Sequence, residues 1–507
     1  MSPTANGDAD QPPDDLEARF ERLARRRLGA ERLISGVRLS GGASQETYRL
    51  RVETRDKSER SFALRRAPGG RGAAAAEGRP MLEIEAALMQ AAGAAGIPEP
   101  EVLWVLTPED ELGVGFVMQW LEGETLGARI VRSPELAEVR PHLARQCGEI
   151  LARIHALDLD ACGLRGALER MPTDRYVSQT YERYLRLGTA QPMIDYAARW
   201  LLDNLPNSSR ETLVHNDFRN GNLMVGEDGV RAVLDWEIAH VGDPVRDLGW
   251  ICVNSWRFGR RQLEVGGFGS IDDLLAGYRE VSGIEIDRGH LRFWIVFGSF
   301  WWAIGCLGMA QHFRSGPDRS VERAAIGRRS SECQVDLVSE LIPGEVELVA
   351  DPETLVEPDE DGATRAPGES PDARGSEMPR IDELVAAAAG YLRGEVMPAS
   401  SGRAGFLARV AANALDVVRR DLLIGPEHRR RERLRLVELL GAAGEAGPGG
   451  DEADLAGLRT RLCTALREGR IDLTDEALRR HLRTTVVNQL AIDQPRYSGF
   501  RAALAEG

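Results

Sequence analysis

Lysine is almost absent from this chain of 507 residues. Of its 64 basic residues only Lys57 is a lysine, and it lies in the polar run ETRDKSERS. A P-loop needs a lysine that reaches nucleotide phosphates, and Schiff-base catalysis needs an amine in a desolvated pocket. A P-loop is therefore excluded and Schiff-base chemistry nearly so. Any basic side chain that holds an anion in this protein should be arginine.

Positive charge is also in deficit. The chain has 79 Asp and Glu against 64 Lys and Arg, which gives a formal net charge of −15. Such a chain has no general electrostatic attraction to nucleic acid or to anionic lipid. We therefore expect neither nucleic acid nor a membrane as a partner.

Cysteine pairs and a signal peptide are missing as well. The six cysteines form no C-x-x-C pair, and the N-terminus MSPTANGDADQPPDD lacks basic and apolar regions. These features predict reduced thiols and a cytoplasmic protein. The uncharged stretch FWIVFGSFWWAIGCLGMA, residues 293–310, is just long enough to span a membrane. Because it is solitary, contains glycine and carries tryptophans near its middle, we interpret it as a buried core helix.

The first two thirds of the chain predict an α+β domain over residues 16–342. Residues 1–15 are rich in Asp and Pro and are expected to form a disordered tail. A helix follows with Leu16, Phe20 and Leu23 on one face, and then several strands. From Leu126 onward the patterns are mainly helical, apart from a β-like interval at 213–236. A β-rich N-lobe should therefore precede a helical C-lobe.

The last third predicts a linker and a second domain. Residues 343–379 contain six Pro, eleven acidic residues and two Arg, a composition that predicts an acidic, disordered linker. Residues 380–507 read as a separate all-α bundle of about five helices. Within it, Gly425-Pro426 is expected to end one helix and Gly441 the next.

The most specific motif is LVHNDFRNGNLMV. Here His215, Asp217 and Asn222 satisfy H-x-D-x-x-x-x-N, and Asp235 follows 13 residues after Asn222 in AVLDWE. This spacing lets a loop hold the Asp217 carboxylate toward an acceptor hydroxyl while Asn222 and Asp235 converge on a metal bound to nucleotide phosphates.

The motif resembles that of the aminoglycoside phosphotransferase and choline kinase group, small-molecule kinases with a protein-kinase-like two-lobe fold. The resemblance covers roughly residues 16–342. It implies that Asp217 is the catalytic base, that Asn222 and Asp235 hold Mg²⁺, and that ATP or GTP is the phosphate donor. The resemblance also makes Asp247, in GDPVRDLGW, look like a residue that braces the loop. His155, in ILARIHALD, is instead interpreted as a core histidine with satisfied hydrogen bonds.

The same resemblance assigns a nucleotide site in the N-lobe. SGGAS would be the phosphate loop and FALR places an arginine where protein kinases keep a lysine. A glutamate of the next helix would be its ion-pair partner, with Glu83 and Glu85 both plausible by type and Glu85 preferred. FVMQWLEG would be the hinge that meets adenine. The residues implied are Gly41, Gly42, Ser44, Arg65, Glu85, Gln119 and Leu121.

The acceptor is less constrained by the sequence. Asp235 and Asp247 are too close for the activation segment of a protein kinase, so we expect a small hydroxylated acceptor. Residues 250–340 hold eleven acidic and eleven basic residues, a balance that argues against a polycationic aminoglycoside without removing it as an alternative. The chain also resembles the phosphotransferase branch associated with acyl-CoA dehydrogenases, which would imply a hydroxyacyl-CoA or similar metabolite.

The C-terminal part leaves a second class of function open. The segments VAANALDVVRRDL and QLAIDQPRYSGF resemble an uncharacterised helical domain found with phosphotransferases of this group. This domain is expected to bind a protein partner or to mediate self-association. The alternative to a kinase is a regulatory or scaffolding protein that binds nucleotide without turnover. The complete set of Asp217, Asn222 and Asp235 favours the enzyme.

Overall fold

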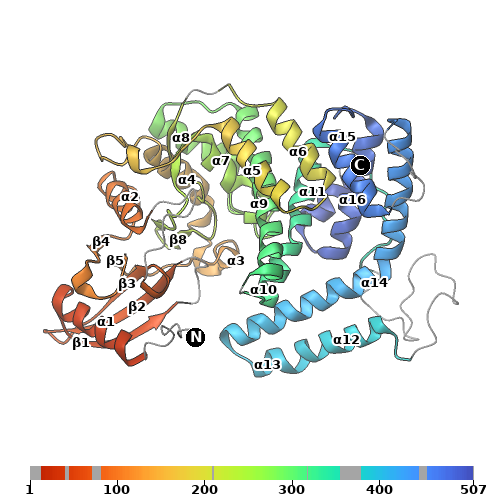
Figure 1. The fold of residues 1–507 in the computed structure, drawn as a ribbon. Coiled ribbons are helices and arrows are strands. Elements are labelled where there is room, and N and C mark those ends of the chain that lie inside the picture. Colours follow the sequence, from red (N-terminus) through yellow and green to blue (C-terminus); the bar gives the residue numbers. More distant parts are fainter. Residues whose placement is uncertain are drawn as a thin grey trace, which may run out of the picture. The chain divides into compact units, whose positions relative to one another are not determined.

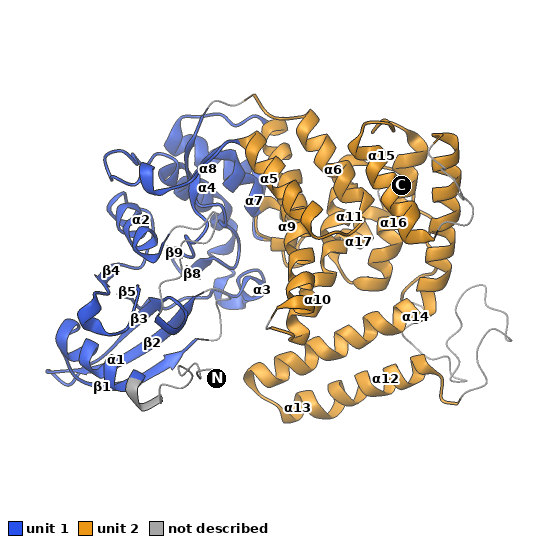
Figure 2. Ribbon diagram, in the orientation of Figure 1, with its two compact units in different colours: residues 1–172, 208–251, 268–287 blue, residues 173–207, 252–267, 288–507 orange. Residues whose placement is uncertain are grey.

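The chain forms two compact units that interleave along the sequence (Figures 1 and 2). The computed structural model describes residues 13–39, 45–70, 81–207, 210–316, 318–353, 378–444 and 454–505. Unit 1 comprises residues 1–172, 208–251 and 268–287, and unit 2 comprises residues 173–207, 252–267 and 288–507. Each unit is described by itself below.

Unit 1 begins with a five-stranded antiparallel sheet in the order β1-β2-β3-β5-β4. The strands are β1 (Ala30–Arg38), β2 (Glu46–Thr54), β3 (Glu59–Arg66), β4 (Val102–Val105) and β5 (Gly115–Gln119). In β2 the even-numbered residues are buried, as the period of two predicts for a strand with one face on a core. The predicted β-rich N-lobe is therefore present.

Two helices pack on this sheet. Helix α1 (Pro13–Arg27) places Phe20 and Leu23 in a core with Tyr48, Leu50 and Leu64. The predicted apolar face of the first helix is thus confirmed. Helix α2 (Leu82–Ala94) contacts β4 and β5, and Glu85 in its first turn is buried.

The rest of unit 1 consists of short strands and helices that hold the loops of the candidate site. A hairpin of β8 (Leu223–Gly226) and β9 (Gly229–Val233) follows β7 (Thr212–Val214), which pairs with β10 (His240–Gly242). Strand β6 (Arg170–Met171) pairs with β10 on its other side. The helices of this part are α3 (Gly127–Ile130), α4 (Leu143–Ile154), α7 (Val245–Cys252) and α8 (Ile271–Ser282).

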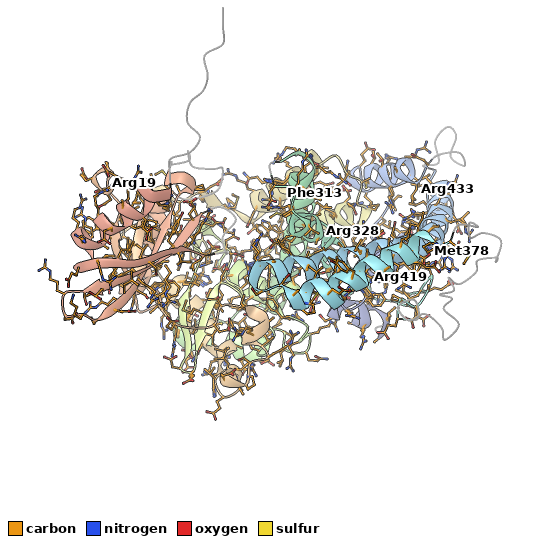
Figure 3. All side chains as sticks on the ribbon, turned by 90° about the horizontal axis from the view of Figure 1, so that it is seen from below. Arg19, Phe313, Arg328, Met378, Arg419 and Arg433 are labelled. Atoms are coloured by element: carbon orange, nitrogen blue, oxygen red, sulfur yellow. The ribbon has the colours of Figure 1, made fainter. Side chains whose placement is uncertain are left out.

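Unit 2 is all-helical in its described part. Helices from before the predicted linker are α5 (Thr173–Arg186), α6 (Pro192–Asp203), α9 (Arg288–Ser315), α10 (Val321–Arg328) and α11 (Ser330–Leu341). Those after it are α12 (Ile381–Tyr391), the short α13 (Met397–Ala399), α14 (Gly402–Ala442), α15 (Leu455–Arg467), α16 (Glu476–Asp493) and α17 (Ser498–Ala505). Figure 3 shows α12 running beside the first half of α14, with Met378 at the start of this pair.

Helix α9 contains the apolar stretch singled out in the sequence. By length and composition it is the one helix among the described residues that could cross a membrane, with a mean hydropathy of 1.6 over 18 residues. Slightly more than half of that window, 56%, is buried inside the protein. Phe293, Phe297 and Phe300 are buried, and α5, α6, α10 and α11 pack around the helix. This packing agrees with the interpretation as a core helix.

The sequence places the start of the disordered linker too early, at residue 343. Residues 343–353 are described, and Val349 and Ala350 pack with Ile424 and Ile492. The N–H of Val349 also donates to Oδ1 of Asn488 at 2.7 Å. The acidic and proline-rich composition of the segment masks the signal of this short apolar pair. Burial of the pair offsets the entropy lost when the segment is ordered. Residues 354–377 of the linker and 1–12 of the tail lie outside the described residues.

The prediction that Gly425-Pro426 ends a helix is wrong. Helix α14 continues through Pro426 to Ala442, and Gly441 does lie at its end. A proline inside a helix loses one hydrogen bond and costs about 3 kcal/mol. Here Ile424, His428 and Leu436 are buried on a continuous stripe, and α14 packs against α15 and α16. Tertiary burial on both sides of the proline outweighs its local cost.

The predicted α+β class is confirmed: a β-rich N-terminal sheet and a helix-rich part are followed by an all-α C-terminal region. The C-terminal helices share unit 2 with helices that precede the linker. Arg467 of α15 pairs with the fully buried carboxylate of Asp195 at 2.6 Å, and Arg199 donates to the carbonyl of Ile471 at 2.7 Å. The domain ranges 16–342 and 380–507 therefore differ from the compact units, and as domain boundaries they remain a prediction.

These contacts predict that the two parts stay together when the linker is cut. A protease recognition sequence inserted within residues 357–374 should allow complete cleavage, and the two fragments should still co-elute in size-exclusion chromatography. Arg467→Ala should lower the denaturant concentration that separates them, because loss of a buried partner costs roughly 1 to 3 kcal/mol. Arg470→Ala, which removes a pair with the exposed Glu468, is the control. Separation of the wild-type fragments without denaturant would show that the contacts do not hold unit 2 together.

Candidate active site

The loop between β7 and β8 presents the Asp217 carboxylate. Its Oδ1 accepts hydrogen bonds from Nε of Arg219 at 3.0 Å and from Nε1 of Trp250 at 2.9 Å. Its Oδ2 accepts from Nδ2 of Asn222. The side chain is 16% exposed, so three donors fix it while one edge stays accessible. This is the arrangement of an oriented carboxylate that can receive a proton from a bound molecule.

Asp247 braces the same loop through hydrogen bonds to its backbone. Its two oxygens accept the backbone N–H groups of His215 at 2.8 Å and of Asn216 at 2.7 Å. Asn216 has a φ of 68°, an unfavourable value for a residue other than glycine, and these bonds help to hold it. His155 also bonds to Asp247 through Nε2 at 3.1 Å and to Tyr278 through Nδ1. The bracing role predicted for Asp247 and the core position predicted for His155 are both confirmed.

The β8–β9 hairpin brings Asn222 and Asp235 to one place. Asn222 comes directly before β8 and Asp235 two residues after β9, and the N–H of Leu234 donates to the carbonyl of Asn222 at 2.8 Å. Nδ2 of Asn222 is occupied by Asp217, which leaves its amide oxygen for another partner. Amide and carboxylate oxygens are the ligands that Mg²⁺ prefers. The donor set therefore fits this ion, although the described residues contain no cluster of three His, Cys, Asp or Glu at metal-binding distance.

The conformation at Asp235 is held by its neighbour. Asp235 has a φ of 72°, and Trp236, which follows it, is fully buried and donates from Nε1 to Glu99 at 3.1 Å. The N–H of Val233 donates to the carbonyl of Pro98 at 2.9 Å. These bonds tie the end of the hairpin to the IPEP segment. The strained backbone of Asp235 is thus fixed from both sides, as expected where orientation of a carboxylate matters.

Arg65 links the sheet to this hairpin. From β3, its Nη2 lies 3.1 Å from Glu85 of α2 and 2.7 Å from Oδ1 of Asp235. Glu83 is exposed, so the structure selects Glu85 as the ion-pair partner. Burial raises the pKa of Glu85 to about 7, against the opposing charge of Arg65. Arg66, the next residue, pairs with Glu46 at 2.9 Å instead, because successive side chains of a strand alternate.

The predicted hinge lies at the end of β5. Gln119 closes the strand, and its N–H donates to the carbonyl of Glu101 at 2.8 Å. For Leu121, two residues further on, the backbone N–H makes no backbone hydrogen bond to a described residue. It remains available to a ligand, and an adenine contact stays a prediction. Gly41, Gly42 and Ser44 of the predicted phosphate loop lie outside the described residues.

Two contacts of Asp217 were missed in the sequence. Arg219 follows Asp217 by two residues, so the motif itself contains a signal for this contact. Trp250 lies 33 residues downstream on α7, and Arg246 of the same helix stacks over its ring at 4.5 Å and donates to Oδ1 of Asn216 at 3.1 Å. No local pattern marks these residues, since only the fold brings α7 under the loop.

Two protein families match parts of this chain. Residues 35–284 match the phosphotransferase enzyme family (APH), and residues 398–497 match a domain of unknown function, DUF6285. Acyl-CoA dehydrogenase family member 11 of Gallus gallus is 30% identical over 297 residues, 53% of this chain and 35% of that protein. Acyl-CoA dehydrogenase family member 10 of Mus musculus is 30% identical over 221 residues, 42% and 20% respectively. The chain thus spans about a third or less of these relatives.

Among solved structures, a spectinomycin phosphotransferase in complex with ADP and spectinomycin is similar with a TM-score of 0.44. It is 14% identical, and the match covers 64% of this chain and 98% of that one. The two family matches fall inside the ranges that the sequence predicted for its two domains. The chain carries a phosphotransferase domain of the APH family, followed by a helical DUF6285 domain.

Proposed function

We propose that this protein transfers the γ-phosphate of a nucleotide to a hydroxyl of a small molecule, with Mg²⁺. The observation that carries the proposal is the convergence of Asp217, Asn222 and Asp235 at the open end of one hairpin. A protein that only binds nucleotide needs no oriented carboxylate beside its metal ligands. Because Arg65 reaches Asp235, the same cluster also includes a cation for the phosphates.

The residues divide the work as their contacts indicate. Asp217 orients the acceptor hydroxyl and takes its proton late, because the transferred phosphoryl group passes through a loose transition state. Arg65, held by Glu85, grips phosphate oxygens with a forked guanidinium in the place of the usual lysine. Asn222 and Asp235 would hold Mg²⁺, which neutralises charge on the phosphates when bound. Arg219 and Trp250 keep Asp217 in its orientation.

A metabolite linked to acyl-CoA is the acceptor that we favour. The curated relatives are named as acyl-CoA dehydrogenase family members, and they are 30% identical to this chain over 221 and 297 residues. Such an acceptor carries anionic phosphates, which an arginine-rich protein can bind. Aminoglycosides are the alternative acceptors, and they would need an acidic pocket to receive their positive charges.

A screen for transfer tests this proposal. Purified protein is mixed with Mg²⁺, ATP or GTP, and hydroxyacyl-CoAs, amino alcohols, sugars or aminoglycosides, and the nucleoside diphosphate formed is measured. We expect acceptor-dependent turnover with at least one hydroxyacyl-CoA and none with aminoglycosides. Turnover with aminoglycosides alone would show that the protein is an aminoglycoside phosphotransferase instead. Nucleotide binding without turnover on any acceptor would favour the scaffold.

Removal of the Arg65 guanidinium should weaken nucleotide binding. A charge-assisted contact contributes roughly 1.5 to 3 kcal/mol, so Arg65→Ala should raise the Kd for the Mg²⁺-bound nucleotide by about 10- to 150-fold. Calorimetry measures this directly. Arg60→Ala, an exposed arginine of the same strand, should leave the Kd unchanged. If Arg65→Ala binds as tightly as the wild type, the phosphates are held by another group.

A further inference from the structure

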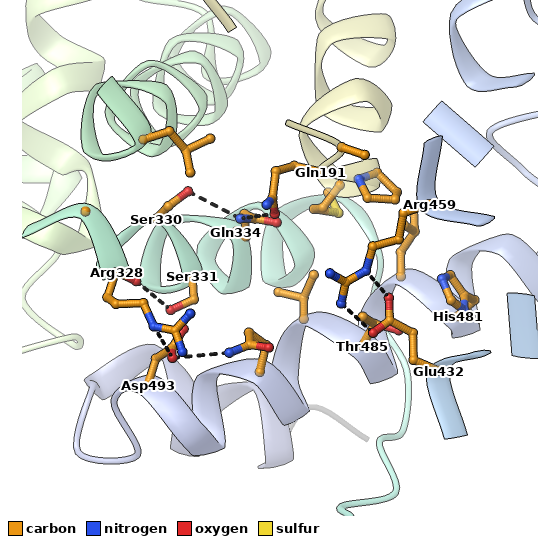
Figure 4. Close-up of a pocket in the computed structure, with 18 residues that line it drawn as sticks. Gln191, Arg328, Ser330, Ser331, Gln334, Glu432, Arg459, His481, Thr485 and Asp493 are labelled. Carbon is orange, nitrogen blue, oxygen red and sulfur yellow. Dashed lines mark hydrogen bonds and ion pairs between the residues drawn. The ribbon is translucent and has the colours of Figure 1, made fainter. Parts of the chain in front are cut away.

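Unit 2 contains a cavity of about 180 Å³ that has no part in the site above. It lies where the start of α6 and the first turns of α11 face α14, α15 and α16 (Figure 4). Helices of the DUF6285 match therefore supply one wall, and segments from before the linker supply the other. Most lining side chains are polar, in contrast to the apolar interior around α9.

The charged groups of this cavity are already paired with one another. Arg459 donates to both oxygens of Glu432, each at 2.6 Å, and the Glu432 side chain is 1% exposed. Arg328 lies 3.1 Å from the nearly buried carboxylate of Asp493. Figure 4 shows these two pairs on different sides of the cavity. Since two cations face two anions, the paired side chains of the lining have no net charge.

Several neutral polar groups of the lining keep unused hydrogen-bonding capacity. Nε2 of Gln334 donates to Oγ of Ser330 and to Oε1 of Gln191, both at 3.3 Å. This leaves Oε1 of Gln334 and Nε2 of Gln191 without a hydrogen bond to a described residue. His481 is 2% exposed, and its Nδ1 is buried without a partner among the described residues. Burial lowers the pKa of His481 to about 3, so its ring is neutral.

Of these three atoms, Nδ1 of His481 is buried, and a buried polar group without a partner is costly and is commonly satisfied by water or by a ligand. A ligand with a net charge would leave an uncompensated charge beside the paired arginines and carboxylates, or would have to break one pair. Either outcome is expensive, because the carboxylates of Glu432 and Asp493 are nearly buried and water screens their charges little. A molecule with donors and acceptors but no net charge meets the unused groups without that cost.

We propose that this cavity binds a small polar metabolite of zero net charge, either zwitterionic or uncharged. Ser330, Gln334 and Gln191 form one recognition edge, and His481 meets the ligand from α16. A cavity of this size holds a ligand on the order of ten non-hydrogen atoms. Bound ligand would join α11 and α16, and with them the two halves of unit 2.

The test uses the full chain and four named probes. L-glutamine and myo-inositol carry no net charge, while L-glutamate and L-lysine are charged molecules of similar size. Binding is measured by calorimetry and by the shift in unfolding temperature. We expect at least one neutral probe to bind with a Kd below about 10 mM, and both charged probes to bind at least about tenfold more weakly.

Variants separate the cavity from other sites. Gln334→Leu and Ser330→Ala should each weaken binding of the neutral probe by about tenfold, the loss expected for one hydrogen bond. Gln494→Leu, an exposed glutamine after α16, is the matched control, and Asp217→Asn should bind the probe normally. Failure of both neutral probes to bind at 10 mM would overturn the proposal in favour of a water-filled cavity. Equal binding of charged probes, or unchanged binding in both cavity variants, would also overturn it.

Discussion

Asp217→Asn should reduce turnover with the true acceptor by at least about 10²-fold, because a positioned acid or base contributes typically 10² to 10⁴-fold. The substitution keeps the size of the side chain and deletes its charge. Nucleotide affinity should be nearly unchanged, since the phosphates are gripped by Arg65 and by the metal ligands. The loss should therefore appear in kcat at saturating nucleotide, measured by acceptor-dependent release of the diphosphate.

The surroundings of Asp217 sharpen this expectation. All three of its partners donate, so an asparagine can replace the acceptor at Oδ1 but would turn an amide N–H₂ toward Nδ2 of Asn222. Asp160→Asn, at a carboxylate that is 69% exposed, is the control for the substitution itself. Full activity of Asp217→Asn with an identified acceptor would remove this residue from the mechanism. A silent substitution in every assay is what the scaffold hypothesis predicts.

Loss of a metal ligand should differ in kind from loss of the base. In Asp235→Ala and Asn222→Ala we expect the Mg²⁺ concentration for half-maximal activity to rise at least about tenfold, because even residues behind the ligands change metal affinity 10- to 100-fold. Turnover at saturating Mg²⁺ should also fall, most in Asp235→Ala, which removes a charge and a partner of Arg65. Titration of activity with Mg²⁺ measures both effects.

A carboxylate of the same hairpin provides the control. Asp228, in the turn between β8 and β9, pairs with Arg231 and is 71% exposed. Asp228→Asn should leave the Mg²⁺ requirement unchanged. If Asp235→Ala and Asp228→Asn show the same Mg²⁺ dependence as the wild type, Asp235 is not a metal ligand, and its strained backbone needs another explanation.

The sequence predicted the candidate site better than the arrangement of the helices. Residues of the H-x-D-x-x-x-x-N motif lie within one loop, so their spacing alone brings Asp217 and Asn222 together. The β8–β9 hairpin then returns the chain to Asp235. For the ion-pair partner of Arg65, the sequence leaves two candidates, Glu83 and Glu85. In the structure Glu85 is buried beside Arg65 and is therefore the partner, whereas the sequence alone could only favour it over Glu83.

Long-range packing was beyond local patterns. The contacts of Trp250 with Asp217 and of Arg467 with Asp195 join segments that no periodicity connects. The local rule for proline predicts that a helix ends at Pro426, whereas burial of residues on both sides keeps α14 continuous. The Val349–Ala350 pair was hidden by acidic neighbours. In each case a tertiary contact outweighed the signal of the surrounding residues.

The most direct measurement is ³¹P NMR of the reaction product. Wild-type protein, Mg²⁺ and nucleotide are incubated with the acceptor that gives the most turnover, and the spectrum is compared with that of the Asp217→Asn protein. We predict a new phosphomonoester signal coupled to the protons of the acceptor carbon, formed as the γ-phosphate signal decays and strongly reduced in Asp217→Asn. Inorganic phosphate as the sole product, or an ester formed equally by both proteins, would contradict the central claim.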